Sequence, residues 1–371
     1  MAGPTDTVTL TAAPALTPLL LRGALRSPFR RPAPDAAFPR TRLLLPGLRV
    51  DLVRLAAYER VCGFPTGEPD LPVTYPHVLG FPLAMRLMSG RDFPLPLPGL
   101  VHTSIEIVRG GVLPADAAYD LSVRVEGLAE HRRGTEATVV TGLRLGGDVV
   151  WESRSTYLAR HGSAATGRSP RPPVRRTEPQ GGPHGAPPRL PEAGTAGPAG
   201  TGRAGETPAE QAGEVLAGQL GEAPAGQFGE APAGGGGLPP ATTAEWRLGG
   251  DVGRRYGAAS GDRNPIHLHP LTARLFGFPR AVAHGMWTVA RCLAAHGTPD
   301  ATEVRARFRA PVLLPGTVAY EADGTGRFAL RGPDGRLHVS GEVRPPPGAR
   351  RTPGGSPRRG DSRTARHSRP A

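Results

Sequence analysis

Apolar and polar positions follow a regular pattern in two blocks of the chain. In the first block, apolar residues recur at helical intervals over Tyr75–Ser89, with Pro82 near the start of that stretch. Strand-like runs follow it: Leu100–Val108, Tyr119–Val125, Ala137–Leu145 and Val149–Leu158. Gly146–Asp148 supplies a hairpin turn between the last two runs. The pattern predicts one long helix followed by an antiparallel meander.

The second block, from Glu245 to Val343, repeats this plan. Asp251–Ala259 is typical of a short helix, a polar loop follows, and a longer helix is expected from about His284 to Ala295. Four strands come next: Glu303–Phe308, Thr317–Ala322, Gly326–Arg331 and Leu337–Val343. A long helix and an antiparallel meander, twice over, predict an α+β fold in which a sheet wraps round a helix in each half.

Composition marks the boundaries between these blocks. Residues 161–243 are dominated by Gly, Pro, Ala, Arg and Glu and contain AGQLGEAP followed directly by AGQFGEAP. Such octamers cannot bury a hydrophobic face, so this stretch is expected to be a flexible linker. Residues 346–371 form a second segment of this kind, rich in Arg. The expected domains are therefore a partly flexible lead segment over 1–42 and folded units over 43–160 and 244–345.

The net charge of +13 lies mainly outside these folded units. Every basic residue is Arg, with no Lys in the sequence. Eight Arg and one Asp occur from Arg344 to the end, and six Arg and one Asp occur between Arg22 and Arg42. A solvated basic tail is therefore favoured over a nucleic-acid-binding face. The non-enzymatic alternative is a nucleic-acid or scaffold protein acting through this tail, which predicts a steeply salt-dependent affinity.

The two cysteines and the apolar runs indicate in which cellular compartment the protein is expected. Cys62 and Cys292 fall in no metal or redox spacing, which favours free buried thiols in a reducing cytosol. The apolar run Pro18–Leu21 is too short to span a bilayer, and Asp6 stands where a secretory leader carries positive charge. We therefore expect a cytoplasmic protein without a membrane segment.

Candidate chemistry is concentrated in SGDRNPIHLHPLTARLFGFPRAVAHGMWT, residues 260–288. Asp262, Asn264 and His267 place a carboxylate, an amide and an imidazole within six residues. The Asn-Pro step favours a turn that brings the carboxylate and the imidazole together. Such a pair is suited to general acid–base catalysis.

The sequence His284-Gly285-Met286 stands at the start of the second predicted long helix. Backbone N–H groups at a helix start are free and carry the positive end of the helix dipole. Gly285 has no side chain to keep a substrate oxygen from that amide. An acid–base pair beside such an amide suits proton transfer next to a thioester carbonyl, because the amide stabilises the developing enolate-like charge.

Residues 260–288 resemble the hydratase signature of MaoC-like dehydratases and (R)-specific enoyl-CoA hydratases, with its SGD-x-NPIH core, a following GF and an AHGM. LPVTYPHVLGFPLAMRLMS, FPLPLPGLVHTSIEI and VVWESRSTYLAR resemble the N-terminal halves of actinobacterial MaoC-family acyl dehydratases. The resemblance implies a double hotdog, in which two antiparallel sheets, each wrapped round a central helix, pack as a pseudo-dimer. It also places the catalytic signature in the second half only.

The resemblance implies a role for each site residue. Asp262 and His267 would be catalytic, Asn264 would position them, and the Gly285 N–H would bind the oxyanion. Further residues are expected to line the substrate: Ser260, Phe278, His284 and Met286. The implied reaction is reversible dehydration of (R)-3-hydroxyacyl thioesters to trans-2-enoyl thioesters in fatty-acid metabolism. Coenzyme A or acyl carrier protein would be part of the substrate, no cofactor or metal is expected, and a homodimer is allowed.

Several alternatives remain open from the sequence. The chain could be a carrier-protein dehydratase of a fatty-acid or polyketide system, or a hotdog thioesterase. The H-x-H spacing of His267 and His269 is compatible with metal binding. Three arginines alternate on one predicted strand and could meet a substrate phosphate or form a solvated face: Arg305, Arg307 and Arg309. In the first half, His77 and His102 are interpreted as structural or substrate-lining.

Overall fold

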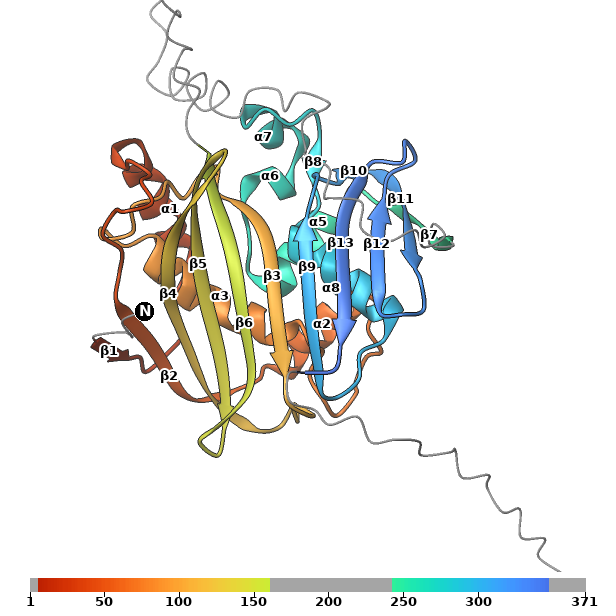
Figure 1. Ribbon diagram of the computed structural model, residues 1–371, viewed down its shortest axis with the longest axis horizontal. Helices are drawn as coiled ribbons and strands as arrows, with labels where there is room; N and C mark the ends of the chain where they lie inside the picture. Colours follow the sequence, from red (N-terminus) through yellow and green to blue (C-terminus); the bar gives the residue numbers. More distant parts are fainter. Residues whose placement is uncertain (1–5, 161–241, 347–371) are drawn as a thin grey trace, which may run out of the picture.

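The computed structural model describes residues 6–160 and 242–346, and within these ranges 11 strands form one continuous curved sheet. The order across it is β1-β2-β4-β5-β6-β3-β9-β13-β12-β11-β7, so each half of the chain supplies one half of the sheet. Figure 1 shows helices α3 and α8 along one face of this sheet. Nearly all of the linker expected at 161–243 and of the tail expected at 346–371 lies outside the described residues.

The first half carries three α-helices and six strands among its described residues. In chain order they are β1 (Asp6–Thr9), α1 (Leu16–Arg26), a 3-10 turn (Ser27–Phe29), β2 (Thr41–Arg49), α2 (Leu52–Cys62), α3 (Tyr75–Met88), β3 (Val101–Arg109), β4 (Ala118–His131), β5 (Gly134–Leu145) and β6 (Asp148–Arg160). Gly146 and Gly147 both have positive φ in the turn between β5 and β6, as the expected hairpin requires.

The described second half follows the same order. Its elements are β7 (Thr242–Leu248), α5 (Val252–Ser260), α6 (Pro265–Leu268), α7 (Pro270–Leu275), β8 (Ala281–Val282), α8 (Gly285–His296), β9 (Thr302–Phe308), β10 (Leu313–Leu314), β11 (Gly316–Ala322), β12 (Arg327–Arg331) and β13 (Leu337–Arg344). The helices and strands expected from periodicity match α3, α5, α8 and the long strands to within a few residues, except that β4 runs six residues further, to His131.

Two expectations about local structure were wrong. The polar loop expected after α5 contains two short helices, α6 and α7, each opened by Pro at its first position. Asn264 and His269 cap these helices, because the side chain of each accepts a backbone N–H two residues ahead. Regular structure also starts before residue 43: β1 pairs in parallel with β2, and α1 packs on α3.

The two expected sheets are joined edge to edge. β3 of the first half pairs antiparallel with β9 of the second, with Ile105 opposite Ala306 and Ile107 opposite Val304. All four of these side chains are buried. Pairing of β3 with β9 satisfies the backbone groups that each sheet would otherwise expose at an edge. The register of this one strand pair therefore fixes how the halves face each other.

Helices also join the halves. α2 begins at its cap Asp51, whose carboxylate accepts the N–H groups of Val53 and Arg54. Arg54 Nε donates to the Ala259 carbonyl of α5 at 2.7 Å. Trp287 of α8 is buried and its Nε1 donates to the Val61 carbonyl of α2 at 2.8 Å. Two sheets wrapped round α3 and α8 and packed as a pseudo-dimer make this a double hotdog fold.

None of the helices in residues 6–160 and 242–346 is long and apolar enough to cross a membrane.

Candidate active site

Two glycines of α5 bring the motif segment close to that helix. A Cβ on Gly253 would lie 1.9 Å from the carbonyl oxygen of His267, and one on Gly257 would lie 2.8 Å from that of Asp262. Real side chains do not tolerate such distances to backbone atoms. Because the two glycines stand four residues apart, they lie on the same side of the helix. The absence of side chains there lets the backbone of Asp262 and His267 pack directly on α5.

Asp262 lies in the turn between α5 and α6. Its Oδ1 accepts the N–H of Asn264 at 3.1 Å, and its own N–H donates to Ser260 Oγ at 3.2 Å. The carboxylate keeps 28% of its surface exposed, in contrast to the buried groups around it. These contacts hold the carboxylate in place while one oxygen, Oδ2, remains available on the side of the histidines.

His267 stands in α6, not in a loop as expected, and is 9% exposed. Its Nδ1 lies 2.6 Å from the Val282 carbonyl oxygen. A carbonyl can only accept, so Nδ1 must carry the proton of the neutral ring. The other nitrogen, Nε2, then holds the lone pair and can act as a base.

His284 precedes α8 as its N-cap residue and stacks on His267, with ring centroids 3.7 Å apart. Its Nε2 donates to the backbone carbonyl of Asp262 at 2.9 Å and lies 3.9 Å from Asp262 Oδ2. Tyr256 of α5 also packs against His284, with 4.8 Å between the ring centroids. His284 therefore ties the start of α8 to the carboxylate-bearing turn.

Burial sets the protonation of both rings. Desolvation lowers the pKa of His267, although the Asp262 charge and the Val282 carbonyl act in the opposite direction. Desolvation, followed by the charge of His267, holds the pKa of His284 well below its ordinary value. Both imidazoles are therefore neutral at pH 7. A neutral His267 next to a partly exposed carboxylate is an acid–base pair ready to accept a proton.

The sequence-expected pair thus converges with a third group. A carboxylate oxygen of Asp262 and one ring nitrogen each of His267 and His284 lie within 4.8 Å of one another. Three such donors would also be a minimal set for a metal ion. His269, the other member of the H-x-H pair, uses its ring to cap α7 and is not in this group.

The start of α8 faces the same cleft. Gly285 is the first helical residue, and N–H groups of a first turn have no partner within the helix. Thr288 Oγ1 donates to the Gly285 carbonyl at 2.6 Å and steadies this turn. A Cβ on Gly285 would lie 3.0 Å from Cε1 of Phe308. The glycine is therefore needed for close approach of Phe308 as well as for access to its amide.

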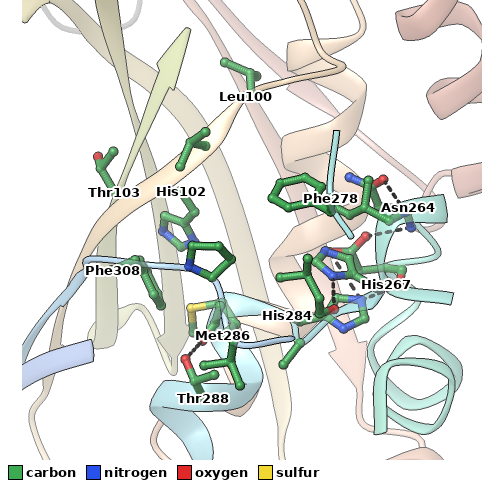
Figure 2. A pocket seen from close by; sticks show the side chains of 18 of the residues that line it. Leu100, His102, Thr103, Asn264, His267, Phe278, His284, Met286, Thr288 and Phe308 are labelled. Atoms are coloured by element: carbon green, nitrogen blue, oxygen red, sulfur yellow. Dashed lines mark hydrogen bonds and ion pairs between the residues drawn. The ribbon is translucent and has the colours of Figure 1, made fainter. Parts of the chain in front are cut away.

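A cavity of 1890 Å³ connects these groups and is lined by both halves of the chain. All eight sequence-expected site residues line it: Ser260, Asp262, Asn264, His267, Phe278, His284, Gly285 and Met286. Figure 2 shows Asn264, His267 and His284 on one side and His102 and Thr103 of β3 on the other, with Phe308 near His102. The site is therefore built between the halves.

Some lining residues were missed by sequence reasoning. Tyr157 of β6 and Phe308 of β9 line the cavity together with His77 and His102. Tyr157 falls within a first-half stretch that carries the resemblance, but nothing in the sequence singles it out. Phe308 is one of several apolar strand residues and gives no signal of its own. Only the strand register across β3 and β9 reveals which side chains reach the cleft.

The three alternating arginines, two in β9 and Arg309 just beyond its end, separate in the structure. Arg305 Nε donates to Glu303 Oε1 at 2.7 Å and does not line the cavity. Arg307 and Arg309 do line it, together with Arg336. Arg309 Nε is buried and has no hydrogen-bond partner among the described residues. One of the three arginines therefore belongs to a solvated face, while the other two line the cavity.

A double hotdog with an Asp–His pair in its cleft is the arrangement that the resemblance to MaoC-like dehydratases implies. Comparisons with known proteins identify the family. The MaoC like domain model matches residues 239–335. The chain is 34% identical over 286 residues to the 3-hydroxyacyl-thioester dehydratase X of Mycobacterium tuberculosis, covering 76% of this chain and 80% of that protein. The chain belongs to the MaoC-like dehydratase family.

Solved structures agree with this assignment. The crystal structure of HtdX from Mycobacterium tuberculosis superposes with a TM-score of 0.58 at 30% identity, covering 82% of this chain and 99% of that one. A MaoC-like dehydratase from Phytophthora capsici matches with a TM-score of 0.51 at 16% identity, covering 84% and 96% respectively. The second match concerns the fold alone.

Proposed function

We propose that this protein catalyses the reversible dehydration of (R)-3-hydroxyacyl thioesters to trans-2-enoyl thioesters in fatty-acid metabolism. The observation that carries the proposal is the grouping of Asp262, His267 and the Gly285 amide in one cleft. Its Mycobacterium tuberculosis relative is named for the dehydration of 3-hydroxyacyl thioesters. The fold, the family and the site chemistry support the same class of reaction.

The two catalytic groups differ in what they offer. His267 Nε2 carries a lone pair, because Nδ1 donates to Val282, and it can remove the proton next to the thioester carbonyl. Asp262 lies beside it and relays the proton taken up by His267 to the β-hydroxyl, which leaves as water, so both groups return to their starting protonation states. In the reverse direction the same pair activates water for addition to the enoyl double bond. Asn264 acts on these groups indirectly, because its N–H holds Asp262 Oδ1 and its side chain caps α6.

Removal of the proton next to the carbonyl places negative charge on the thioester oxygen. The free amide at Gly285, at the positive end of α8, supplies a donor for that oxygen. The side chains of Met286 and Phe278 line the cleft nearby and reduce access of water. A donor fixed before the reaction costs no reorganisation as the charge develops.

The arginines that line the cavity are the basis for proposing what carries the acyl group. Arg307, Arg309 and Arg336 line one part of the cavity and could meet phosphate groups of coenzyme A or of phosphopantetheine. The apolar part of the cavity, lined by Phe81, Met85 and Met88 of α3, would take the acyl chain. A cavity of this volume, lined by both the arginines and these apolar side chains, fits a medium or long acyl thioester.

The test is a direct assay of the purified protein. Loss of the ultraviolet absorbance of trans-2-octenoyl-CoA measures hydration, and chiral analysis of the product measures stereochemistry. We expect the (R)-3-hydroxy product. The same assay with the octenoyl carrier-protein thioester compares the two carriers. Release of free thiol without hydration would instead mean a thioesterase, and formation of the (S) product would contradict the proposal.

A further inference from the structure

Helix α3 presents a row of side chains to the cavity. His77, Phe81, Met85 and Met88 all line it, at intervals of four, four and three residues that keep them on one face of the helix. The last three are apolar, and side chains of α1, including Leu20 and Leu21, line the same region. His77 is therefore the one polar member of an otherwise apolar row, and it stands at the N-terminal end of the helix.

His77 belongs to a stack of rings contributed mainly by the first half. Its ring lies parallel to that of His102 on β3, with centroids 5.9 Å apart. His102 stacks in turn on Tyr157 of β6 at 4.5 Å and contacts Phe308 of β9 at 4.7 Å. Figure 2 shows His102 beside Phe308, across the cavity from His267 and His284. The stack is a second polar wall opposite the acid–base pair.

Two nitrogens of this wall are unsatisfied. His77 is 9% exposed, and neither its Nδ1 nor Nε2 of His102 has a hydrogen-bond partner among the described residues. A buried polar atom without a partner costs free energy, so its retention needs a reason. Purely structural packing would be served better by phenylalanine in a row that already contains Phe81 and Met85. The unsatisfied nitrogens point to a ligand that brings the missing hydrogen-bonding group.

We propose that His77 and His102 form a hydrogen-bonding site for an uncharged oxygen on the acyl chain, a hydroxyl or oxo group beyond the carbon that loses water. The proposal rests on the proposed function, because it concerns the acyl part of the same thioester substrate. It assigns the selection of substituted acyl chains to the half of the protein that lacks the catalytic motif.

Position and charge support an uncharged oxygen. The ring stack faces His267 and His284 across the cavity, and His77 precedes the apolar row along α3, so the stack lies near the reacting end of the acyl chain and before that row. Burial lowers the pKa of His77 to about 4 and that of His102 well below its ordinary value. Neutral imidazoles both donate and accept, which suits a hydroxyl or a carbonyl. An ionised carboxylate at this position would be repelled by Asp262, whose charge acts on His77.

The test compares an unsubstituted enoyl substrate with two derivatives that each carry one additional oxygen. Hydration of trans-2-octenoyl-CoA and of its 5-hydroxy and 5-oxo derivatives is measured as kcat/KM with the full chain. We expect the native protein to prefer an oxygenated substrate on the order of tenfold, the scale of one or two neutral hydrogen bonds. In His102→Phe and in His77→Phe that ratio should fall towards one. Binding of octanoyl-CoA and 5-hydroxyoctanoyl-CoA, followed by calorimetry, should show the same loss of preference.

The control variant is His296→Phe. His296 is the last residue of α8, its Nδ1 contacts the Tyr320 hydroxyl, and it is not among the residues that line the cavity. This change should keep the native ratio. If a phenylalanine variant unfolds, the same substrate ratio is measured in His102→Gln. This variant keeps a donor and an acceptor, so it should retain a preference for the oxygenated chain.

Three outcomes overturn the proposal. The native protein could show no preference for either oxygenated chain. The variants could lose rate equally on all substrates, which would assign the rings to the leaving hydroxyl. The ratio could survive in both phenylalanine variants. An inactive native protein on every substrate would instead contradict the proposed function, while the calorimetric preference would still test the site.

Discussion

The imidazole rings of His267 and His284 stack with their centroids 3.7 Å apart, and each donates its one N–H to a backbone carbonyl. Two protonated rings at this distance would repel each other strongly. Burial keeps both rings neutral, the stack disfavours protonation of both at once, and the remaining lone pair of His267 points away from Val282. This relationship governs how activity and stability depend on pH.

The first prediction concerns that pH dependence. Burial lowers the pKa of His267, so its base form should persist below pH 6.5, the ordinary value for histidine. We expect kcat/KM for hydration to hold steady from pH 8 to about 6.5 and to fall only at lower pH, as a profile would show. A fall that begins above pH 7 would contradict a neutral buried base.

The lowered pKa values of the buried histidines also predict how the stability of the fold depends on pH. His267, His284 and His77 all have folded-state pKa values below 6.5, with His77 at about 4. The unfolded chain then binds more protons than the folded one as the pH falls below 6.5, so stability must decrease in that range. Thermal midpoints measured between pH 7.5 and 4.5 should fall with pH, and replacing His77 by Phe should flatten the curve.

The second prediction concerns the acid–base pair. Asp262→Asn and His267→Ala should each lower kcat/KM by about a hundredfold or more, the usual scale for losing a positioned acid or base. His269→Ala is the matched control: it lies on the same segment but caps α7 instead of joining the cluster. It should cost some stability and little activity. Near-native turnover in either of the first two variants would remove the catalytic assignment.

The third prediction concerns Gly285. Gly285→Val should lower kcat/KM by about a hundredfold or more, the scale of losing one oxyanion donor. The new Cβ would also press on Phe308, at 3.0 Å from Cε1, so part of the effect could come from packing. Adding Phe308→Ala to the variant removes that clash. If the double variant recovers thermal stability but not rate, the amide is needed for catalysis, whereas recovery of both would leave only a packing role.

The fourth prediction concerns α5. Gly253→Ala places a methyl 1.9 Å from the His267 carbonyl, which must move α6 away from α5. Overpacking of this kind typically costs about 1–3 kcal/mol of stability. Rate should fall with stability, because the moved residue is the base itself. Gly324→Ala is a comparison at a turn where a Cβ meets nothing within 4 Å but φ is +72°, so only backbone strain applies. Urea unfolding and hydration rates are measured on both variants. If Gly253→Ala loses no more stability or rate than Gly324→Ala, the contact between α5 and the His267 backbone does not require glycine at position 253.

The fifth prediction separates proton transfer from metal catalysis. Dialysis against a chelator should leave the hydration rate unchanged, because the proposed steps use only His267, Asp262 and an amide. Added Zn²⁺ should inhibit, because it would engage the three donors that converge within 4.8 Å. Loss of activity on chelation, restored by one particular metal, would overturn the acid–base account.

Local sequence patterns were sufficient for α3, α5 and α8, most strands and the convergence of the motif residues, whereas α1, α2 and β2 were not predicted. The Asn-Pro turn and the helix start at Gly285 follow from short-range chemistry, so their geometry could be anticipated. The fold class followed from the repeated order of a helix and a meander. The resemblance added the pseudo-dimeric packing of the halves.

What could not be anticipated depends on contacts between distant segments. The proton on His267 is fixed by Val282, and the place of His102 in the cleft is fixed by the pairing of β3 with β9. α6 and α7 are too short to show helical periodicity, so the sequence predicts a loop over these residues. The function of Gly253 as a contact point for the His267 backbone is invisible without the structure, since a helix interior offers no local reason for glycine.

The two walls of the cleft have different origins in the chain, and this has a consequence for how the protein can change over evolutionary time. The acid–base pair and the amide come from residues 262–285, whereas His77, His102 and the apolar row of α3 come from the first half. Under the proposed function, a substitution in that row alters which acyl group fits without touching a proton-transfer residue. Duplicated descendants of such a gene could therefore diverge in substrate range through mutations in one half, while purifying selection keeps the chemistry constant in the other.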